Sequence, residues 1–83
     1  MDEIVRLSKE ARASMPSTGE IASVTKETDN FGFTITCFME SYTIELNVKF
    51  ASRKYYQVLT REQYIKFFGE QVIALIGVAM ADE

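Results

Sequence analysis

The chain has 83 residues, of which 47% are hydrophobic and 25% charged, and its net charge at pH 7 is −3. This composition is typical of one folded globular domain, here residues 1–83, and argues against intrinsic disorder. The sequence contains no histidine and one cysteine, Cys37. It therefore lacks the commonest catalytic base, every Ser-His or Cys-His nucleophile pair and the usual zinc ligands, so we expect no enzyme activity, no metal and no cofactor.

The cysteine count and the first residues favour a cytoplasmic location. Cys37 has no second cysteine with which to form a disulfide inside the chain, which is typical of a reducing compartment. Asp2 and Glu3 stand where a secretory signal would be basic. The most apolar segment, residues 72–81, is half as long as the ~20 residues that span a bilayer, so we expect no membrane segment.

The sequence of residues 3–28 predicts one helix followed by one strand. Residues 3–14 have apolar side chains three or four apart, as expected for one face of a helix: Ile4, Leu7, Ala11 and Met15. Pro16 and the small polar residues after it end this helix. Residues 20–28 predict a first strand, whose apolar content is Ile21, Ala22 and Val24.

Three further strands are predicted, joined by short turns. Asp29 and Asn30 suit a two-residue hairpin turn, because both residue types tolerate positive φ. The next strand, residues 31–39, places on one face Phe31, Phe33, Ile35, Cys37 and Met39, so we expect Cys37 to be a small buried hydrophobe. After a turn at residues 40–41, residues 42–50 alternate strictly, with one side formed by Tyr42, Ile44, Leu46, Val48 and Phe50. Residues 51–53 turn the chain into a last strand, residues 54–59, for which a loop is the alternative.

The C-terminal segment predicts one long helix over residues 61–81. Thr60 and Gln63 match a capping box, and Leu59 and Tyr64 occupy the positions of a hydrophobic staple. The predicted fold is therefore α+β, with a short N-terminal helix, a four-stranded antiparallel meander and a long C-terminal helix packed on the sheet.

Residues 72–81 are apolar almost all round, and a helix of this kind must be covered on more than one side. One sheet and one short helix offer little cover, so we expect the C-terminal helix also to pack on a second subunit. The predicted homodimer interface comprises Phe68, Gly69, Val72, Leu75, Ile76, Ala79 and Met80.

One cluster has the composition of a binding surface. Residues 49–66 carry a local charge of +4, interleaved with tyrosines, in a chain that is acidic elsewhere. Tyr55 and Tyr56 face opposite sides of a strand, so one of them is expected in the core. Phe38 falls on the polar face of the sheet, where an aromatic residue can anchor a partner. The predicted partner-binding residues are Phe38, Lys49, Arg53, Lys54, Tyr56 and Arg61.

These features favour a small non-enzymatic protein-interaction module, an inhibitor or adaptor that docks on a larger protein or nucleoprotein machine. Compact acidic chains of this size without catalytic residues resemble the accessory proteins of phages and other mobile elements, which often block host enzymes or defence complexes. Two alternatives stay open. One is a nucleic-acid-binding protein that uses residues 49–66, which the net charge of −3 disfavours. The other is a protein that binds a small ligand between the sheet and the C-terminal helix.

Overall fold

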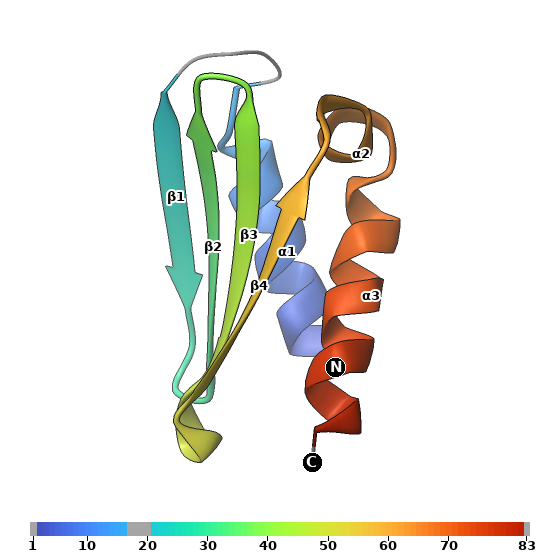
Figure 1. Cartoon of the computed structure of the whole chain (residues 1–83). Coiled ribbons are helices and arrows are strands. Elements are labelled where there is room, and N and C mark those ends of the chain that lie inside the picture. The colour runs from blue at the N-terminus through green and yellow to red at the C-terminus, as the bar shows by residue number, and fades with distance from the viewer. Residues whose placement is uncertain (1, 17–20, 83) are drawn as a thin grey trace.

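The computed structural model describes residues 2–16 and 21–82 (Figure 1). Its elements in chain order are α1 (Asp2–Ala13), β1 (Ala22–Glu27), β2 (Phe31–Phe38), β3 (Ser41–Val48), the 3-10 turn η1 (Lys49–Ala51), β4 (Arg53–Leu59), α2 (Arg61–Lys66) and α3 (Phe68–Ala81). Within this part of the chain, the strands form one antiparallel sheet in the order β1-β2-β3-β4. The predicted α+β meander is confirmed, and the alternative with residues 54–59 as a loop is wrong.

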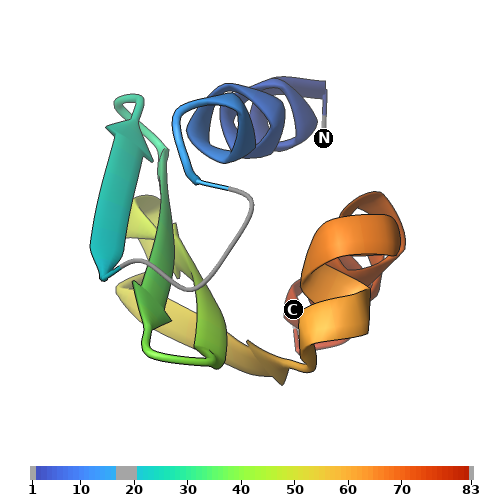
Figure 2. The same ribbon diagram turned by 90° about the horizontal axis from the view of Figure 1, so that it is seen from above.

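Both long helices lie on the same face of the sheet. Figure 2 shows α1 over one half of the sheet and α3 over the other half. The contacts agree, because α1 packs on β1 and β2 whereas α3 packs on β3 and β4. No described element covers the opposite face, which we call the open face.

The alternation of β3 gives the sheet its covered face. Tyr42, Ile44 and Leu46 are fully buried and Val48 is 5% exposed. The strand ends at Val48, two residues before the predicted end, because the chain turns into η1 and Ser52 adopts the left-handed conformation with φ 53° and ψ 40°. Phe50, predicted to point inward from a strand, therefore lies in η1 and is 64% exposed.

The β1–β2 and β2–β3 turns differ in whether the backbone adopts positive φ. The Asp29-Asn30 turn is confirmed, since Thr28 N–H donates to the Phe31 carbonyl at 2.7 Å and the Thr28 hydroxyl accepts from Phe31 N–H at 3.2 Å. Neither turn residue has positive φ. Positive φ occurs instead at Met39, at 57°, which starts the β2–β3 turn and is 65% exposed, so its predicted place on the buried strand face is wrong.

The predicted C-terminal helix is divided in two at Phe67. The capping box is confirmed: the Thr60 hydroxyl accepts from Gln63 N–H at 3.1 Å, and the Gln63 side chain accepts from Thr60 N–H at 2.9 Å. Phe67 has φ −122° and ψ 27°, outside the helical region, and α2 turns away from the axis of α3 (Figure 1). This break allows Tyr64 of α2 to stack on Tyr42, with ring centroids 4.3 Å apart, while α3 lies along the sheet.

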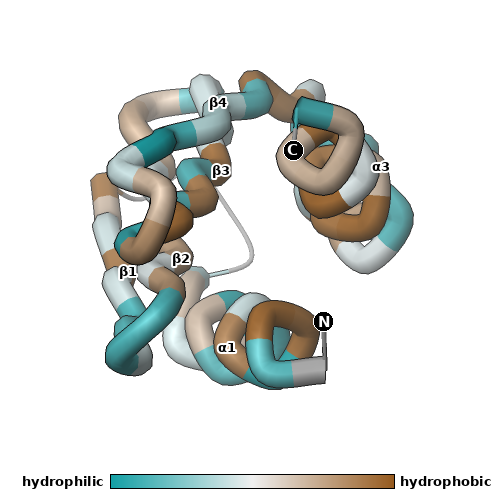
Figure 3. Tube along the Cα trace, turned by 90° about the horizontal axis from the view of Figure 1, so that it is seen from below, coloured by the Kyte–Doolittle hydropathy of each residue, from teal (hydrophilic) through white to brown (hydrophobic). Residues whose placement is uncertain are grey.

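One hydrophobic core joins the sheet to the helices. The predicted face of α1 is buried, as are the predicted Cys37 and the staple residues Leu59 and Tyr64. Figure 3 shows that α3 is mostly apolar on all sides, whereas α1 alternates between polar and apolar residues. The buried hydrophobic residues are Ile4, Leu7, Ala11, Met15, Phe33, Ile35, Cys37, Tyr42, Ile44, Leu46, Val48, Leu59, Tyr64, Val72, Leu75, Ile76 and Ala79.

Candidate functional site

The open face is formed by the strand residues that alternate with the core residues. Most of them are hydroxyl-bearing or charged, and they lie on all strands of the sheet: Ser23, Thr25, Glu27, Gly32, Thr34, Thr36, Phe38, Ser41, Thr43, Glu45, Asn47, Lys54, Tyr56 and Val58. The hydroxyls of Thr25 and Thr34 lie 3.0 Å apart across β1 and β2. Such a face is ordinary for a solvated sheet, since threonine suits exposed strands.

Four large apolar or aromatic side chains interrupt this polar surface. Phe38 is 58% exposed, Tyr56 61% and Val58 70%. Ile21, just before β1, is 71% exposed, and the strand register continues outward from Ala22 and Cys37 to the pair Ile21 and Phe38. We call Ile21, Phe38, Tyr56 and Val58 the open-face patch.

The predicted partner residues Phe38 and Tyr56 share this face but do not touch. Phe38 lies on β2 opposite Ser41, and Tyr56 lies on β4 opposite Glu45, so their rows are four residues apart along β3 and standard strand spacings separate them by about 16 Å. Val58 lies between their rows because it pairs with Thr43 of β3. The sequence analysis did not select Val58. Its position two residues after Tyr56 on the same strand predicts that both side chains lie on the same face.

Tyr56 lies on the open face beside its neighbour on β3. Glu45 is the direct cross-strand partner of Tyr56, and their side chains share a hydrogen bond. This hydrogen bond is the main reason that the pKa of Tyr56 is raised above its usual 10.0. Tyr55, which faces the other way, is partly buried against the core, as predicted for one of the two tyrosines.

The predicted basic residues do not form one surface. Lys54 is on the open face near the start of β4, whereas Arg61 begins α2 beyond the other end of that strand. A strand of this length separates the two ends by about 20 Å. A phosphate backbone would therefore not find one continuous basic patch at residues 49–66.

Two of these basic residues also contact other parts of the chain. Lys49 is half-buried; its Nζ donates to the Thr28 carbonyl at 2.9 Å and lies 3.6 Å from the Glu27 carboxylate. Arg53 lies on the helix-covered side of β4 and donates to the Asp82 carbonyl at 3.0 Å. These contacts give Lys49 and Arg53 a structural role at the lower end of the sheet in Figure 1.

The structure places most of the predicted dimer-interface residues inside the protein's own core. Val72, Leu75, Ile76 and Ala79 are only 2–6% exposed, because they face the covered side of the sheet. They are therefore not available to a second subunit. Phe68 is partly buried, with its ring in edge-to-face contact with Phe33 and Tyr64 at centroid distances of 6.3 and 6.2 Å.

Gly69 and Met80 are the predicted interface residues that stay exposed, and they belong to different surfaces. Met80 is 53% exposed beside an apolar cavity, described below. Gly69 lies on the outward side of α3 together with residues that sequence reasoning did not select; we call Gly69, Ile73, Gly77 and Val78 the outer face of α3. Ile73 is 65% and Val78 55% exposed. Helical spacing places them on the side of α3 that is opposite the buried residues Val72 and Ile76, and this spacing could have predicted their exposure.

Within residues 2–16 and 21–82, no group of three or more Cys, Asp and Glu side chains is placed to hold a metal ion. The Cys37 thiol is 1% exposed and donates to the Met39 carbonyl at 3.7 Å.

The same described ranges contain no helix long and apolar enough to cross a membrane. Comparisons of the chain with protein-family models, with curated proteins and with solved structures find no match.

Proposed function

We propose that this protein is a small non-enzymatic protein-interaction module that docks on a larger protein through the open face of its sheet. The observation that carries the proposal is the open-face patch, in which aromatic and branched apolar side chains stand 58–71% exposed on a rigid sheet. Aromatic residues dominate the energetics of protein interfaces, so Phe38 and Tyr56 are the expected anchors.

The patch is large enough to anchor a partner but too small to bind it alone. Complete burial of one such side chain contributes about 1.5–3 kcal/mol, and these side chains are already partly covered. Association itself costs about 4–15 kcal/mol. The partner must therefore also contact the hydroxyl rows beside the patch, such as Thr36 and Thr43. This requirement favours a flat protein surface over an isolated side chain.

An inhibitor or adaptor role of the phage-accessory type fits this geometry, because such a protein needs only to occupy a surface. The buried free thiol of Cys37 agrees with action in the cytoplasm. The scattered basic residues do not favour the nucleic-acid alternative.

The test is affinity capture from lysate of the native host, with and without nuclease. We expect wild-type protein to retain one stoichiometric protein after nuclease treatment and Phe38→Ala to lose it. Ile65→Ala is the matched control, because Ile65 is also an exposed apolar residue, at 40%, but belongs to α2. Recovery that depends on nucleic acid, or that is equal for both variants, would contradict docking through the open face.

We also propose that a second copy of the chain covers the outer face of α3. In an antiparallel pairing of the two α3 helices, with the two-fold axis at the level of Leu75, Ile73 lies against Gly77 of the partner subunit. A Cβ added at Gly77 would meet nothing within 4 Å, so this position leaves room for the Ile73 side chain.

The area of this helix face limits the strength of the dimer. One short face is much smaller than the about 800 Å² per partner of a standard interface, so we expect a dissociation constant in the micromolar range or weaker. Sedimentation velocity across low to high micromolar concentrations should show mass increasing with concentration for wild type and for Ile65→Glu, but not for Ile73→Glu. A wild-type mass that stays monomeric throughout would refute the dimer.

A further inference from the structure

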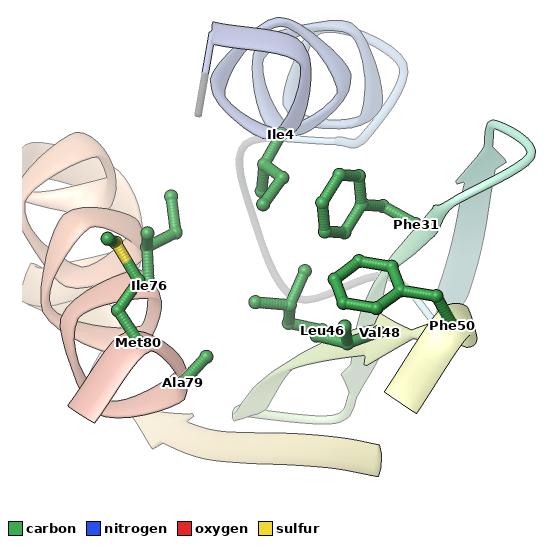
Figure 4. Close-up of a pocket in the computed structure, with 8 residues that line it drawn as sticks. All are labelled: Ile4, Phe31, Leu46, Val48, Phe50, Ile76, Ala79 and Met80. Atoms are coloured by element: carbon green, nitrogen blue, oxygen red, sulfur yellow. The ribbon is translucent and has the colours of Figure 1, made fainter. Parts of the chain in front are cut away.

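An apolar cavity of about 180 Å³ lies at the end of the molecule where α1 begins and α3 ends (Figure 4). Its side chains come from five elements, α1, β2, β3, η1 and α3. Ile4 of α1 lies on one side, Ile76 and Met80 of α3 lie on another, and Leu46 and Val48 of β3 form the floor. Every lining residue is apolar.

The arrangement of the helices accounts for the cavity. Because α1 packs on β1 and β2 while α3 packs on β3 and β4, the two helices lie apart over the middle of the sheet. Ala79 of α3 also lines this space, and its side chain is too small to fill it. The chain leaves β3 at Val48 and enters η1, which brings the Phe50 ring to the mouth.

The rim of the cavity exposes large apolar side chains to solvent. Phe50 is 64% and Met80 53% exposed, and both line the cavity. The Phe50 ring meets Phe31 edge to face at 5.7 Å, which holds the aromatic side of the mouth in place. An apolar molecule in the cavity would cover these side chains as well as fill the space between the helices.

We propose that this cavity binds the apolar part of a small molecule, an aromatic ring or an alkyl chain of about six carbons, with any polar end left at the mouth. The volume supports this class, since an engineered apolar cavity of about 150 Å³ in another protein binds benzene. The lining excludes a charged or hydrogen-bonding group inside, because its polar atoms would be buried without partners.

The position of the cavity separates this ligand from the proposed protein partner. The open-face patch is on one side of the sheet and the cavity is on the helix-covered side. A protein docked on the open face would not reach the cavity through the sheet. The inference therefore does not rest on the proposed function, and we assign the cavity to a free small molecule.

The test is titration of the full-length protein with toluene and with 1-hexanol, followed by NMR of side-chain methyl groups. We expect saturable shifts at the methyl groups of Ile4, Leu46 and Ile76, with a dissociation constant below about 1 mM. Ala79→Leu fills the cavity and should weaken binding at least tenfold. Ala13→Leu makes the same change at an exposed position of α1 and should leave binding unchanged.

A second variant, at the rim of the cavity, tests the proposal independently of Ala79→Leu. Met80→Ala removes an exposed rim side chain without touching the core, and it should weaken binding several-fold even if Ala79→Leu does not fold. Shifts that do not saturate with either probe, or unchanged affinity in Ala79→Leu, would overturn the proposal.

Discussion

Replacing either of two stacked tyrosines by phenylalanine should change the free energy of unfolding, but in opposite directions. Tyr42 and Tyr64 are both fully buried, and their rings stack at 4.3 Å with an interplanar angle of 16°. The Tyr64 hydroxyl donates to the Pro16 carbonyl at 2.9 Å. The Tyr42 hydroxyl has no hydrogen-bond partner among residues 2–16 and 21–82. Replacing either tyrosine by phenylalanine removes one oxygen and keeps the stacked ring.

The expected magnitudes follow from the partners of each oxygen. A buried polar group without a partner costs about 1–3 kcal/mol, so Tyr42→Phe should raise the free energy of unfolding by about 1 kcal/mol or more. Tyr64→Phe should lower it by about 1–2 kcal/mol, because it removes a hydrogen bond and leaves the Pro16 carbonyl unpaired. The two variants should therefore differ by at least about 2 kcal/mol.

Urea unfolding followed by far-UV circular dichroism measures this difference. With a slope of about 1 kcal/mol/M for a small domain, the midpoints of the two variants should lie about 2 M apart, on opposite sides of wild type. All samples need the same protein concentration, because self-association stabilises the folded state. A loss of stability in Tyr42→Phe equal to that in Tyr64→Phe would refute the reasoning, since it would show that the Tyr42 hydroxyl is also hydrogen-bonded.

Three further predictions concern single side chains. Arg12 stacks over the Tyr64 ring at 4.3 Å and lies 6.0 Å from the Phe68 ring, so Arg12→Ala should cost about 1 kcal/mol of stability in urea unfolding, and Arg12→Lys less. Ser52→Gly should raise the melting temperature by a few degrees in calorimetry, because glycine adopts φ 53° without steric cost. Burial raises the pKa of Tyr64 above its usual 10.0, although nearby Arg12 lowers it in part, so the folded state keeps this proton longer than the unfolded state. Stability should therefore be constant below about pH 10 and fall as the pH rises further, and Tyr64→Phe should flatten this fall in urea titrations at alkaline pH.

Local sequence signals predict most of the fold because they act within a few residues. The alternation through Tyr42 and Val48 defines β3, and the Thr60-Gln63 capping box sets the start of α2 to the residue. The break at Phe67 carries no such signal. The break depends on packing between distant elements, because Tyr64 stacks on Tyr42 whereas α3 lies along the sheet.

The candidate surfaces could be predicted only in part, because burial depends on how elements pack. The exposure of Phe38 follows from strand register alone. The buried side of α3 does not follow from the sequence, because Val72 and Ile73 are equally apolar and only the position of the sheet distinguishes them. The cavity depends on Ile4, Val48 and Ile76, which meet only in the folded chain.

Site-specific photocrosslinking tests docking through the open face most directly. A photoreactive phenylalanine analogue replaces Phe38 in one sample and Ile65 in another, and both proteins are illuminated in lysate of the native host. Because Phe38 is 58% exposed, this replacement leaves the core intact. The proposal predicts one discrete protein crosslinked from position 38 and none from position 65. Crosslinking from position 65 with none from position 38 would contradict it.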